Sequence, residues 1–241
     1  MLIVGHRGAS AQWPEQSRAA LDAAWEEGAD GVEVDLRLTR DGHLLLQHDA
    51  DFHRCCGDPR RVRELDSGGR HALNCCRSRP DLPPEPPLLL EELLELAPRE
   101  TLLMLELKEG PEQVAPLCAA LAGRSARVLV ISFQLDTLRE LRRREENLPL
   151  LWLREWNRPP NPRTLAGWLR TAHREGLQGL DLDERCLNPE VCQAVSGAGL
   201  ELGAWTVDDP VRGQQLGSWG VTWLTTNQPG QLRRALSVDS G

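Results

Sequence analysis

The sequence predicts an α/β fold, a (β/α)₈ TIM barrel that carries a β-hairpin and a loop-rich insertion. Short apolar runs alternate with amphipathic segments along nearly all of the 241 residues, as expected for a chain of strand–helix units. Once a hairpin arm is set aside, eight strands remain, which suits the length of such a barrel. A doubly wound sheet is the alternative, but no Gly-x-Gly-x-x-Gly sequence follows the first strand.

Apolar runs mark the expected strands, because strands buried on both faces are hydrophobic throughout. The expected strands cover residues 2–4, 31–38, 44–47, 101–107, 128–132, 149–153, 179–182, 200–206 and 221–225. The expected helices cover residues 17–27, 88–96, 111–122, 135–146, 164–175, 189–198, 210–216 and about 230–236. Ser17 is the expected N-cap of the first helix, and Pro111 and Pro189 suit first helical turns.

Two segments depart from the strand–helix rhythm. Asp41-Gly42 between two apolar runs predicts a tight turn, so the strand that leads to His48 should pair back on the strand before it. Residues 50–87 are rich in Arg, Cys, Gly and Pro, which predicts a loop-like insertion over the barrel mouth. We therefore expect residues 1–241 to form a single domain rather than two.

Charge and composition exclude several classes of protein. The net charge is −8 and no basic stripe is present, so nucleic acid is not an expected partner. No apolar stretch is long enough to span a membrane, and the first residues do not resemble a signal peptide, so a cytoplasmic location is expected. Nothing in the composition indicates the oligomeric state.

The cysteines include two adjacent pairs, Cys55-Cys56 and Cys75-Cys76. Neither pair has the Cys-x-x-Cys spacing that is usual at zinc sites. Reduced thiols are the expectation for a cytoplasmic protein, and disulfides formed in purified protein or a metal site are the alternatives.

Two short motifs indicate the chemistry of the expected site. Glu33 and Asp35 alternate within one strand, so both carboxylates project to the same face. The run before them ends at His6-Arg7. Carboxylates beside a His–Arg pair suggest a hard metal ion held next to an anionic substrate.

Further charged residues follow later strands. His48-Asp49 and Glu106-Leu107-Lys108 each lie at the end of an apolar run. Active sites of (β/α)₈ barrels lie at the carboxyl ends of the strands, where all these groups are expected to meet. This set contains carboxylates to bind a metal cation, cationic side chains to bind an anion and two imidazoles to transfer protons. Such a combination suits phosphodiester cleavage.

The same motifs resemble those of the glycerophosphodiester phosphodiesterase family, in its compact cytoplasmic bacterial form. The resemblance runs in order over essentially the whole chain. The motifs that carry it are His6-Arg7-Gly8, Pro14-Glu15, Glu33-Val34-Asp35, Thr39-Arg40-Asp41-Gly42, His48-Asp49, Glu106-Leu107-Lys108 and Trp205-Thr206-Val207.

The resemblance implies divalent-cation-dependent hydrolysis of small-molecule glycerophosphodiesters to sn-glycerol 3-phosphate and an alcohol. It implies that Glu33, Asp35 and Glu106 bind the cation, Mg²⁺ or Ca²⁺, and that His6 and His48 are the general acid and base. In the family mechanism a glycerol hydroxyl attacks phosphorus, and water opens the resulting cyclic phosphate.

Four more residues receive roles from the resemblance. Arg7 and Lys108 would hold the phosphate, and Trp205 would pack against the glycerol. Glu15 would lie in or next to the site. The alternatives are a surface helix-cap role for Glu15, a core role for Trp205 and an ion pair between Glu106 and Lys108.

Two positions depart from the family pattern. Gln16 stands in place of Asn, so we expect a hydrogen bond near the site to be longer or missing, and Asn227 stands in place of Asp, which removes a charge. A lyso- or sphingo-phospholipid phosphodiesterase on the same barrel is one alternative. A barrel that binds phosphodiesters without cleaving them is the other.

Overall fold

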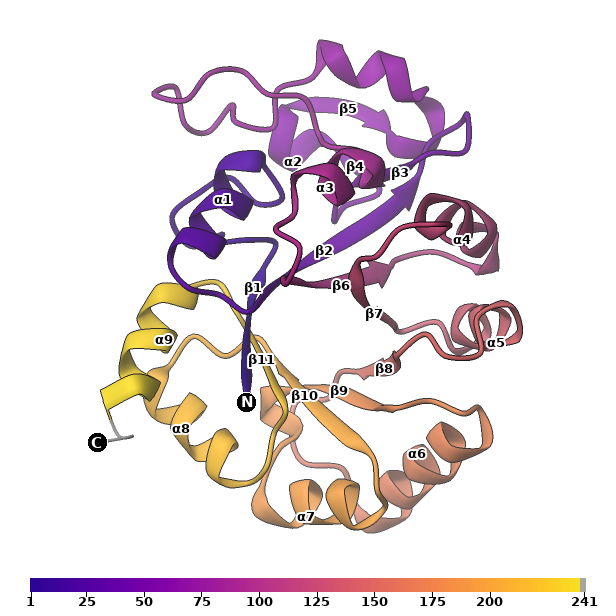
Figure 1. Cartoon of the computed structure of the whole chain (residues 1–241), viewed down its shortest axis with the longest axis vertical. Coiled ribbons are helices and arrows are strands. Elements are labelled where there is room, and N and C mark those ends of the chain that lie inside the picture. The colour runs from indigo at the N-terminus through magenta and orange to yellow at the C-terminus, as the bar shows by residue number, and fades with distance from the viewer. Residues whose placement is uncertain (239–241) are drawn as a thin grey trace.

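The structure of the protein is a computed structural model that describes residues 1–238, and eight of its parallel strands close into a barrel (Figure 1). The strands in order around the barrel are β1 (Leu2–His6), β2 (Gly31–Leu38), β6 (Leu102–Leu107), β7 (Arg127–Ser132), β8 (Leu150–Arg154), β9 (Gly179–Asp183), β10 (Glu201–Trp205) and β11 (Trp223–Thr226). The barrel closes because β1 pairs with both β2 and β11. The predicted fold class is confirmed.

Helices surround the strands as a ring in Figure 1. They are α1 (Arg18–Glu26), α3 (Leu90–Leu96), α4 (Val114–Leu121), α5 (Leu135–Arg144), α6 (Pro162–Arg174), α7 (Pro189–Gly197), α8 (Pro210–Ser218) and α9 (Pro229–Val238), with short 3₁₀ turns at Pro111–Gln113 and Glu184–Cys186. The Ser17 hydroxyl caps α1 by accepting a hydrogen bond from the amide of Ala20. Asn161 and Asn188 cap α6 and α7 in the same way.

Two apolar layers hold the barrel together. The interior is filled by a cluster that comprises Val4, Leu102, Met104, Leu129, Ile131, Leu151, Leu153 and Trp223. A larger cluster lies between the strands and the surrounding helices. Leu102 and Trp223 lie at the amino-terminal ends of their strands, whereas inward-facing polar side chains such as Glu106 lie toward the carboxyl ends.

The predicted hairpin is present. β3 (Leu44–Leu46) pairs antiparallel with β2, and Gly42 has φ +88° in the turn, a conformation that glycine adopts without steric cost. Gln47 and His48 follow β3 directly, and the amide of Gln47 donates to the carbonyl of Asp35. The hairpin thus carries the chain back along β2, so that His48 lies near the level of Asp35.

The insertion contains more secondary structure than its composition predicts. It includes β4 (Asp51–Phe52), α2 (His53–Cys56), β5 (Asp58–Arg61) and two 3₁₀ turns, Val62–Glu64 and Ser67–Ala72. An apolar cluster of Leu45, Phe52, Val62, Leu65 and Leu73 ties these pieces to β3. The predicted loop-rich insertion is therefore present, and residues 51–72 within it form elements that are too short to produce a periodic pattern.

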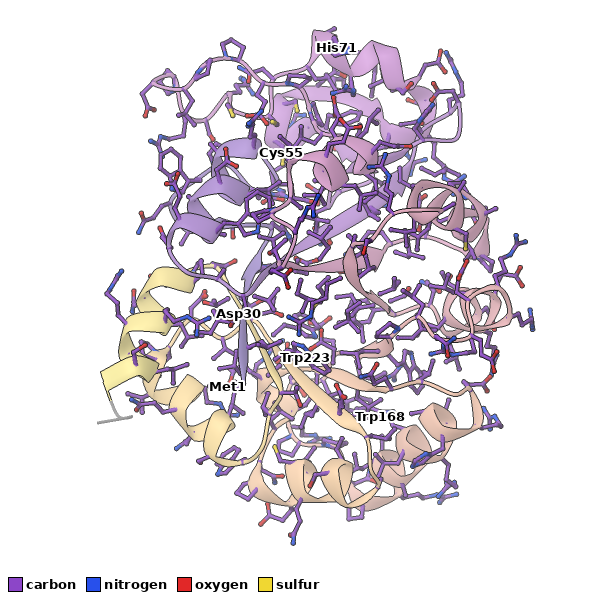
Figure 2. All side chains as sticks on the ribbon, viewed as in Figure 1. Met1, Asp30, Cys55, His71, Trp168 and Trp223 are labelled. Carbon is purple, nitrogen blue, oxygen red and sulfur yellow. The ribbon has the colours of Figure 1, made fainter. Side chains whose placement is uncertain are left out.

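The cysteine pairs lie in this insertion, at the top of the view in Figure 2, where Cys55 and His71 are labelled far from Trp168 of α6. All seven cysteines of the chain are free thiols in the structure. Burial raises the pKa of Cys55 to about 11 and that of Cys56 to about 12. Such thiols stay protonated at neutral pH and are weak nucleophiles, and the reduced state of the cysteines stays a prediction from the sequence.

Within residues 1–238, no helix is both long enough and apolar enough to cross a membrane.

Candidate active site

A cavity of about 290 Å³ opens among the carboxyl ends of the barrel strands. It is lined by His6, Arg7, Glu33, His48, Glu106, Lys108, Ile131, Phe133, Leu153, Glu155, Asp181, Trp205 and Thr225. Most of the site residues predicted from the sequence are in this list. Their meeting follows from the parallel barrel, in which all carboxyl ends of strands lie at the same edge.

Three buried carboxylates lie together at one side of the cavity, where Glu33 and Glu106 line its wall and Asp35 lies behind them. Glu33 and Asp35 alternate on β2, and Asp35 lies opposite Glu106 in the register between β2 and β6. One oxygen from each carboxylate lies within 4.8 Å of the other two. Burial, with the repulsion of Asp35 and Glu106, raises the pKa of Glu33 well above its usual range, and burial raises that of Glu106 to about 7.

Two cations lie against the same carboxylates. The Arg7 Nε atom is 3.0 Å from Asp35 Oδ2, and Lys108 Nζ is 3.2 Å from Asp35 Oδ1 and 2.9 Å from Glu106 Oε1. Burial alone would raise the pKa of Asp35, but Arg7 and Lys108 outweigh burial and hold it below its usual value. Glu106 and Lys108 therefore form an ion pair, which is the alternative role that the sequence left open for Glu106.

The backbone of Arg7 adopts a left-handed conformation, with φ +55°. Its amide donates to the carbonyl of Glu33 at 2.9 Å and to Glu33 Oε2 at 3.2 Å. Gly8 follows with φ +84°, where a Cβ would come within 2.4 Å of the carbonyl oxygen of Ala20. This close approach to α1 fixes the turn that directs Arg7 over the carboxylates.

His6 is held by an amide. Its Nδ1 donates to Asn227 Oδ1 at 2.7 Å, and the Ser10 hydroxyl donates to the same oxygen at 2.8 Å. Asn227 Nδ2 donates in turn to Asp208 Oδ2 at 2.7 Å, which fixes the orientation of the amide. The other ring nitrogen of His6, Nε2, is left toward the cavity, 3.9 Å from Glu33 Oε2.

His48 is held by a carboxylate. Its Nδ1 donates to Asp49 Oδ1 at 2.8 Å, so Nε2 remains available at the cavity. Burial lowers the pKa of both His6 and His48, which favours neutral imidazoles near neutral pH.

Arg54 is a site neighbour that the sequence did not indicate. From α2 in the insertion, it donates to Asp49 Oδ2 at 2.6 Å and to both carboxylate oxygens of Glu15 at 2.5 and 2.8 Å. Glu15 also accepts from Arg7 Nη1 at 3.2 Å. Glu15 therefore lies beside the site, and the surface-cap interpretation does not describe it. The sequence did not indicate Arg54 because it lies between two motifs, in a segment whose composition predicts a loop.

The expectation that Gln16 lengthens or removes a hydrogen bond is wrong. Gln16 Nε2 donates to Asp35 Oδ2 at 2.9 Å, and the amide of Asp35 donates to Gln16 Oε1 at the same distance. The longer side chain reaches Asp35 because the Gln16 backbone is left-handed, with φ +59°. Asn227 carries no charge, as expected, but its side-chain amide donates a hydrogen bond to the Asp208 carboxylate. A negative charge therefore remains close to this position.

The wall opposite the carboxylates is mostly apolar. Ile131, Phe133, Leu153 and Trp205 line it, and the rings of Phe133 and Trp205 meet edge to face with centroids 5.8 Å apart. Trp205 thus packs in the core and also borders the cavity. The cavity has a charged half and an apolar half.

A larger hollow of about 720 Å³ lies at the other end of the barrel, beside the beginnings of β6 and β7. It is bordered by exposed side chains that include Arg99, Arg124 and Arg127. It contains neither the carboxylate group nor the histidines, and catalytic groups of such barrels lie at the opposite face.

Glu33, Asp35 and Glu106 fit a hard divalent cation. All three ligands are carboxylates, they converge within ligand-to-ligand distances, and their mutual repulsion is only partly offset by Arg7 and Lys108. Oxygen-only ligands suit Mg²⁺ or Ca²⁺ rather than a soft metal.

One barrel mouth thus brings together three carboxylates that fit a cation, two oriented imidazoles and two half-buried cationic side chains, as expected of a (β/α)₈ hydrolase that acts on phosphate esters. Residues 6–231 match the model of the glycerophosphoryl diester phosphodiesterase family. The chain belongs to this family, so the prediction of a phosphoric diester hydrolase is confirmed.

Individual relatives match this chain along nearly the whole length of both proteins. The glycerophosphodiester phosphodiesterase of Caldanaerobacter subterraneus is 26% identical over 96% of this chain and 96% of its own. The Thermotoga maritima enzyme structure superposes with a TM-score of 0.81 at 22% identity, covering 97% of each chain. An Oleispira antarctica phosphodiesterase, solved with the product sn-glycerol-3-phosphate, gives a TM-score of 0.87 at 20% identity, covering 98% of this chain and 97% of that chain.

Proposed function

We propose that the protein hydrolyses glycerophosphodiesters to sn-glycerol 3-phosphate and an alcohol with the help of Mg²⁺ or Ca²⁺. The observation that carries the proposal is the convergence of Glu33, Asp35 and Glu106 with two histidines around one cavity. Family membership supports the reaction class, and the product bound to the Oleispira relative supports the nature of the product.

The proposed cation ligands are Glu33, Asp35 and Glu106. A bound cation would act as a Lewis acid toward phosphate oxygens and neutralise charge in the transition state. Arg7 and Lys108 would hold the remaining phosphate oxygens, Arg7 through its planar guanidinium. Both cations already lie within 3.2 Å of the carboxylates, so the phosphate would enter a preorganised field.

His6 and His48 are the proposed proton carriers. Each ring has Nδ1 engaged, by Asn227 and Asp49 respectively, so each presents Nε2 for proton exchange. One imidazole takes the proton of the attacking hydroxyl, which is a glycerol hydroxyl in the family mechanism, and the other protonates the departing alkoxide. Water then opens the cyclic phosphate that this attack forms, which gives sn-glycerol 3-phosphate.

The size of the cavity disfavours the phospholipid alternative. About 290 Å³ equals the volume of roughly ten water molecules in the liquid. A small phosphate ester fills that volume, whereas a long acyl chain needs an extended apolar groove. The cytoplasmic location and the absence of a nucleic-acid partner stay predictions from the sequence.

The test is release of sn-glycerol 3-phosphate from a panel of glycerophosphodiesters, with Mg²⁺ or Ca²⁺ and then with EDTA. We expect cation-dependent release, and a loss of about 10²–10⁴-fold in kcat for His6→Ala and for His48→Ala. His173→Ala is the matched control, because that histidine is exposed on α6.

Unchanged turnover in either site variant would remove that histidine from the mechanism. Folded wild-type protein that binds the diesters yet releases no product with either cation would favour the non-catalytic alternative.

A further inference from the structure

Asp181 is a buried acid in the cavity that the proposed chemistry does not use. It lies in the middle of β9, is 1% exposed and borders the cavity on the side of the apolar wall. Among residues 1–238, no group donates a hydrogen bond to its Oδ1 atom. A buried oxygen without a hydrogen bond destabilises the folded protein. The presence of Asp181 at this position therefore indicates a hydrogen-bond partner that comes from outside the chain.

Asp183, two residues further along β9, has the opposite character. It is 4% exposed, and its carboxylate accepts from Arg185 Nε at 2.8 Å and from Arg185 Nη2 at 2.5 Å. A buried carboxylate with a purely structural role is paired in this way. Asp181 is buried to a similar extent, but within the described residues its Oδ1 atom has no such partner.

The strands around Asp181 hold its carboxyl in place. Gly203 is its neighbour on β10, and a Cβ at that position would come within 2.4 Å of Asp181 Oδ1. The indole N–H of Trp205 donates to the backbone carbonyl of Asp181 at 3.4 Å. The carboxyl therefore occupies the space that a side chain at position 203 would take, with Trp205 beside it.

Asp181 is also a polar group in the half of the cavity that is mostly apolar, where Glu155 after β8 is the other acid in the lining. The phosphate would lie against Arg7 and Lys108, so the organic part of the substrate points to the half bordered by Phe133 and Trp205. A wholly apolar group would leave Asp181 unsatisfied there, whereas a hydroxyl both donates and accepts.

We propose that Asp181 is a specificity-determining residue that binds a hydroxyl of the glycerol moiety of the substrate. This inference rests on the function proposed above and adds to it the group that distinguishes a glycerol ester from other phosphodiesters. Glycerol is favoured over the second alcohol because it is small enough for a cavity of about 290 Å³ and carries hydroxyls in every substrate of the class.

Burial, with a smaller contribution from Glu106, raises the pKa of Asp181 to about 8. Near neutral pH the group is then an uncharged acid with one O–H donor and further acceptor sites. Such a group matches a hydroxyl and does not require a cationic ligand.

The experiment compares Asp181→Ala and Asp181→Asn with the wild type on three substrates. These are glycerophosphoglycerol, glycerophosphocholine and 2-hydroxypropyl phosphocholine, which keeps the attacking hydroxyl of glycerol and lacks the terminal one. We expect Asp181→Ala to raise KM about tenfold for both glycerol esters, the size of one lost hydrogen bond. On 2-hydroxypropyl phosphocholine its kcat/KM should stay within about twofold of the wild type, and Asp181→Asn should retain most activity on all three.

A uniform loss on all three substrates would assign Asp181 a structural role and overturn the proposal. A loss confined to glycerophosphocholine in Asp181→Asn would overturn it in favour of an ionised carboxylate that binds the ammonium group.

Calorimetry separates this proposal from the proposed catalysis. Wild-type protein should bind sn-glycerol 3-phosphate more tightly than methyl phosphate, and Asp181→Ala should remove the difference even if no diester is cleaved. Equal affinities in the wild type would overturn the role of Asp181 and leave the catalytic proposal standing.

Discussion

Arg54 connects two parts of the candidate site from outside the barrel. It bridges Glu15, which contacts Arg7, and Asp49, which holds His48. The bridge is bidentate toward Glu15, a geometry that arginine adopts and lysine does not. A single side chain in the insertion therefore positions both a proposed phosphate ligand and a proposed proton carrier.

Replacing Arg54 with alanine should lower kcat by about tenfold, since Asp49 and Glu15 would lose their shared donor and the His48 ring its fixed orientation. Arg54→Lys should recover only part of the rate. Steady-state kinetics on a glycerophosphodiester measure the effect. Arg60→Ala is the control, because Arg60 lies in the same insertion and pairs with Asp58. Equal rates in the two alanine variants would show that the bridge has no positioning role.

At the scale of elements, the insertion depends on its own apolar cluster. Phe52 of β4 is fully buried there against Val62, Leu65 and Leu73. Phe52→Ala should destabilise this part by about 3–5 kcal/mol, as large-to-small core substitutions do, and Phe52→Leu by less. Urea denaturation measures the loss. Because Arg54 follows Phe52 by two residues, the activity of Phe52→Ala should fall together with its stability. Full activity and unchanged stability in this variant would contradict the role of the apolar cluster in holding the insertion.

Glu175 links two neighbouring helices. At the end of α6 it accepts two hydrogen bonds of 2.9 Å from Arg139 of α5 and one of 2.8 Å from Arg174. These arginines lower its pKa to about 2. The stabilisation is therefore complete above the ordinary pKa of about 4.5 and is lost as the pH falls toward 2.

Glu175→Gln should therefore lower stability at pH 7, by up to about 1 kcal/mol for a pair near the surface. The difference from the wild type should shrink at pH 3 and again in 1 M salt, where the pair is screened. Thermal melts at the two pH values measure it. A difference that grows on acidification would contradict the assignment.

At the scale of the whole molecule, the sequence predicted the barrel well because its strands are continuous apolar runs separated by capped helices. The same periodicity located Glu33 and Asp35, since alternation in a strand is enough to put them on one face. The resemblance then supplied partners from distant strands, such as Glu106, that local pattern cannot pair.

The contacts that were missed depend on loop geometry. The bond from Gln16 to Asp35 requires a left-handed residue in a turn, and the support of Asn227 by Asp208 requires two separate loops to meet. The unpaired oxygen of Asp181 could not be predicted either, because Asp181 and Asp183 alternate identically on β9 and only the structure shows which one has a partner. The alternating pattern of a strand predicts the face on which a side chain lies, but it does not predict which residues that side chain contacts across the barrel.

Repulsion among the site carboxylates should make the stability of the whole barrel respond to cations. Binding that is specific to the folded state adds about 2.7 kcal/mol at a cation concentration of 100 Kd, which corresponds to about 5–10 °C in Tm for a chain of this size. Mg²⁺ or Ca²⁺ should therefore raise Tm, and EDTA should reverse the change. We also propose that residues 1–241 form one domain, so the melt should show a single transition.

Glu33→Gln should abolish most of that rise without lowering Tm in EDTA. Burial, with the repulsion of Asp35 and Glu106, raises the pKa of Glu33 well above its usual range, so a neutral amide at this position removes an unfavourable negative charge at little cost when no cation is bound. Glu190→Gln, at an exposed carboxylate on α7, should keep the full response. Differential scanning calorimetry with each cation distinguishes the variants. If Glu33→Gln melted with the same cation-induced shift as the wild type, the cation would bind elsewhere, and the three carboxylates would have to be explained by their pairing with Arg7 and Lys108 alone.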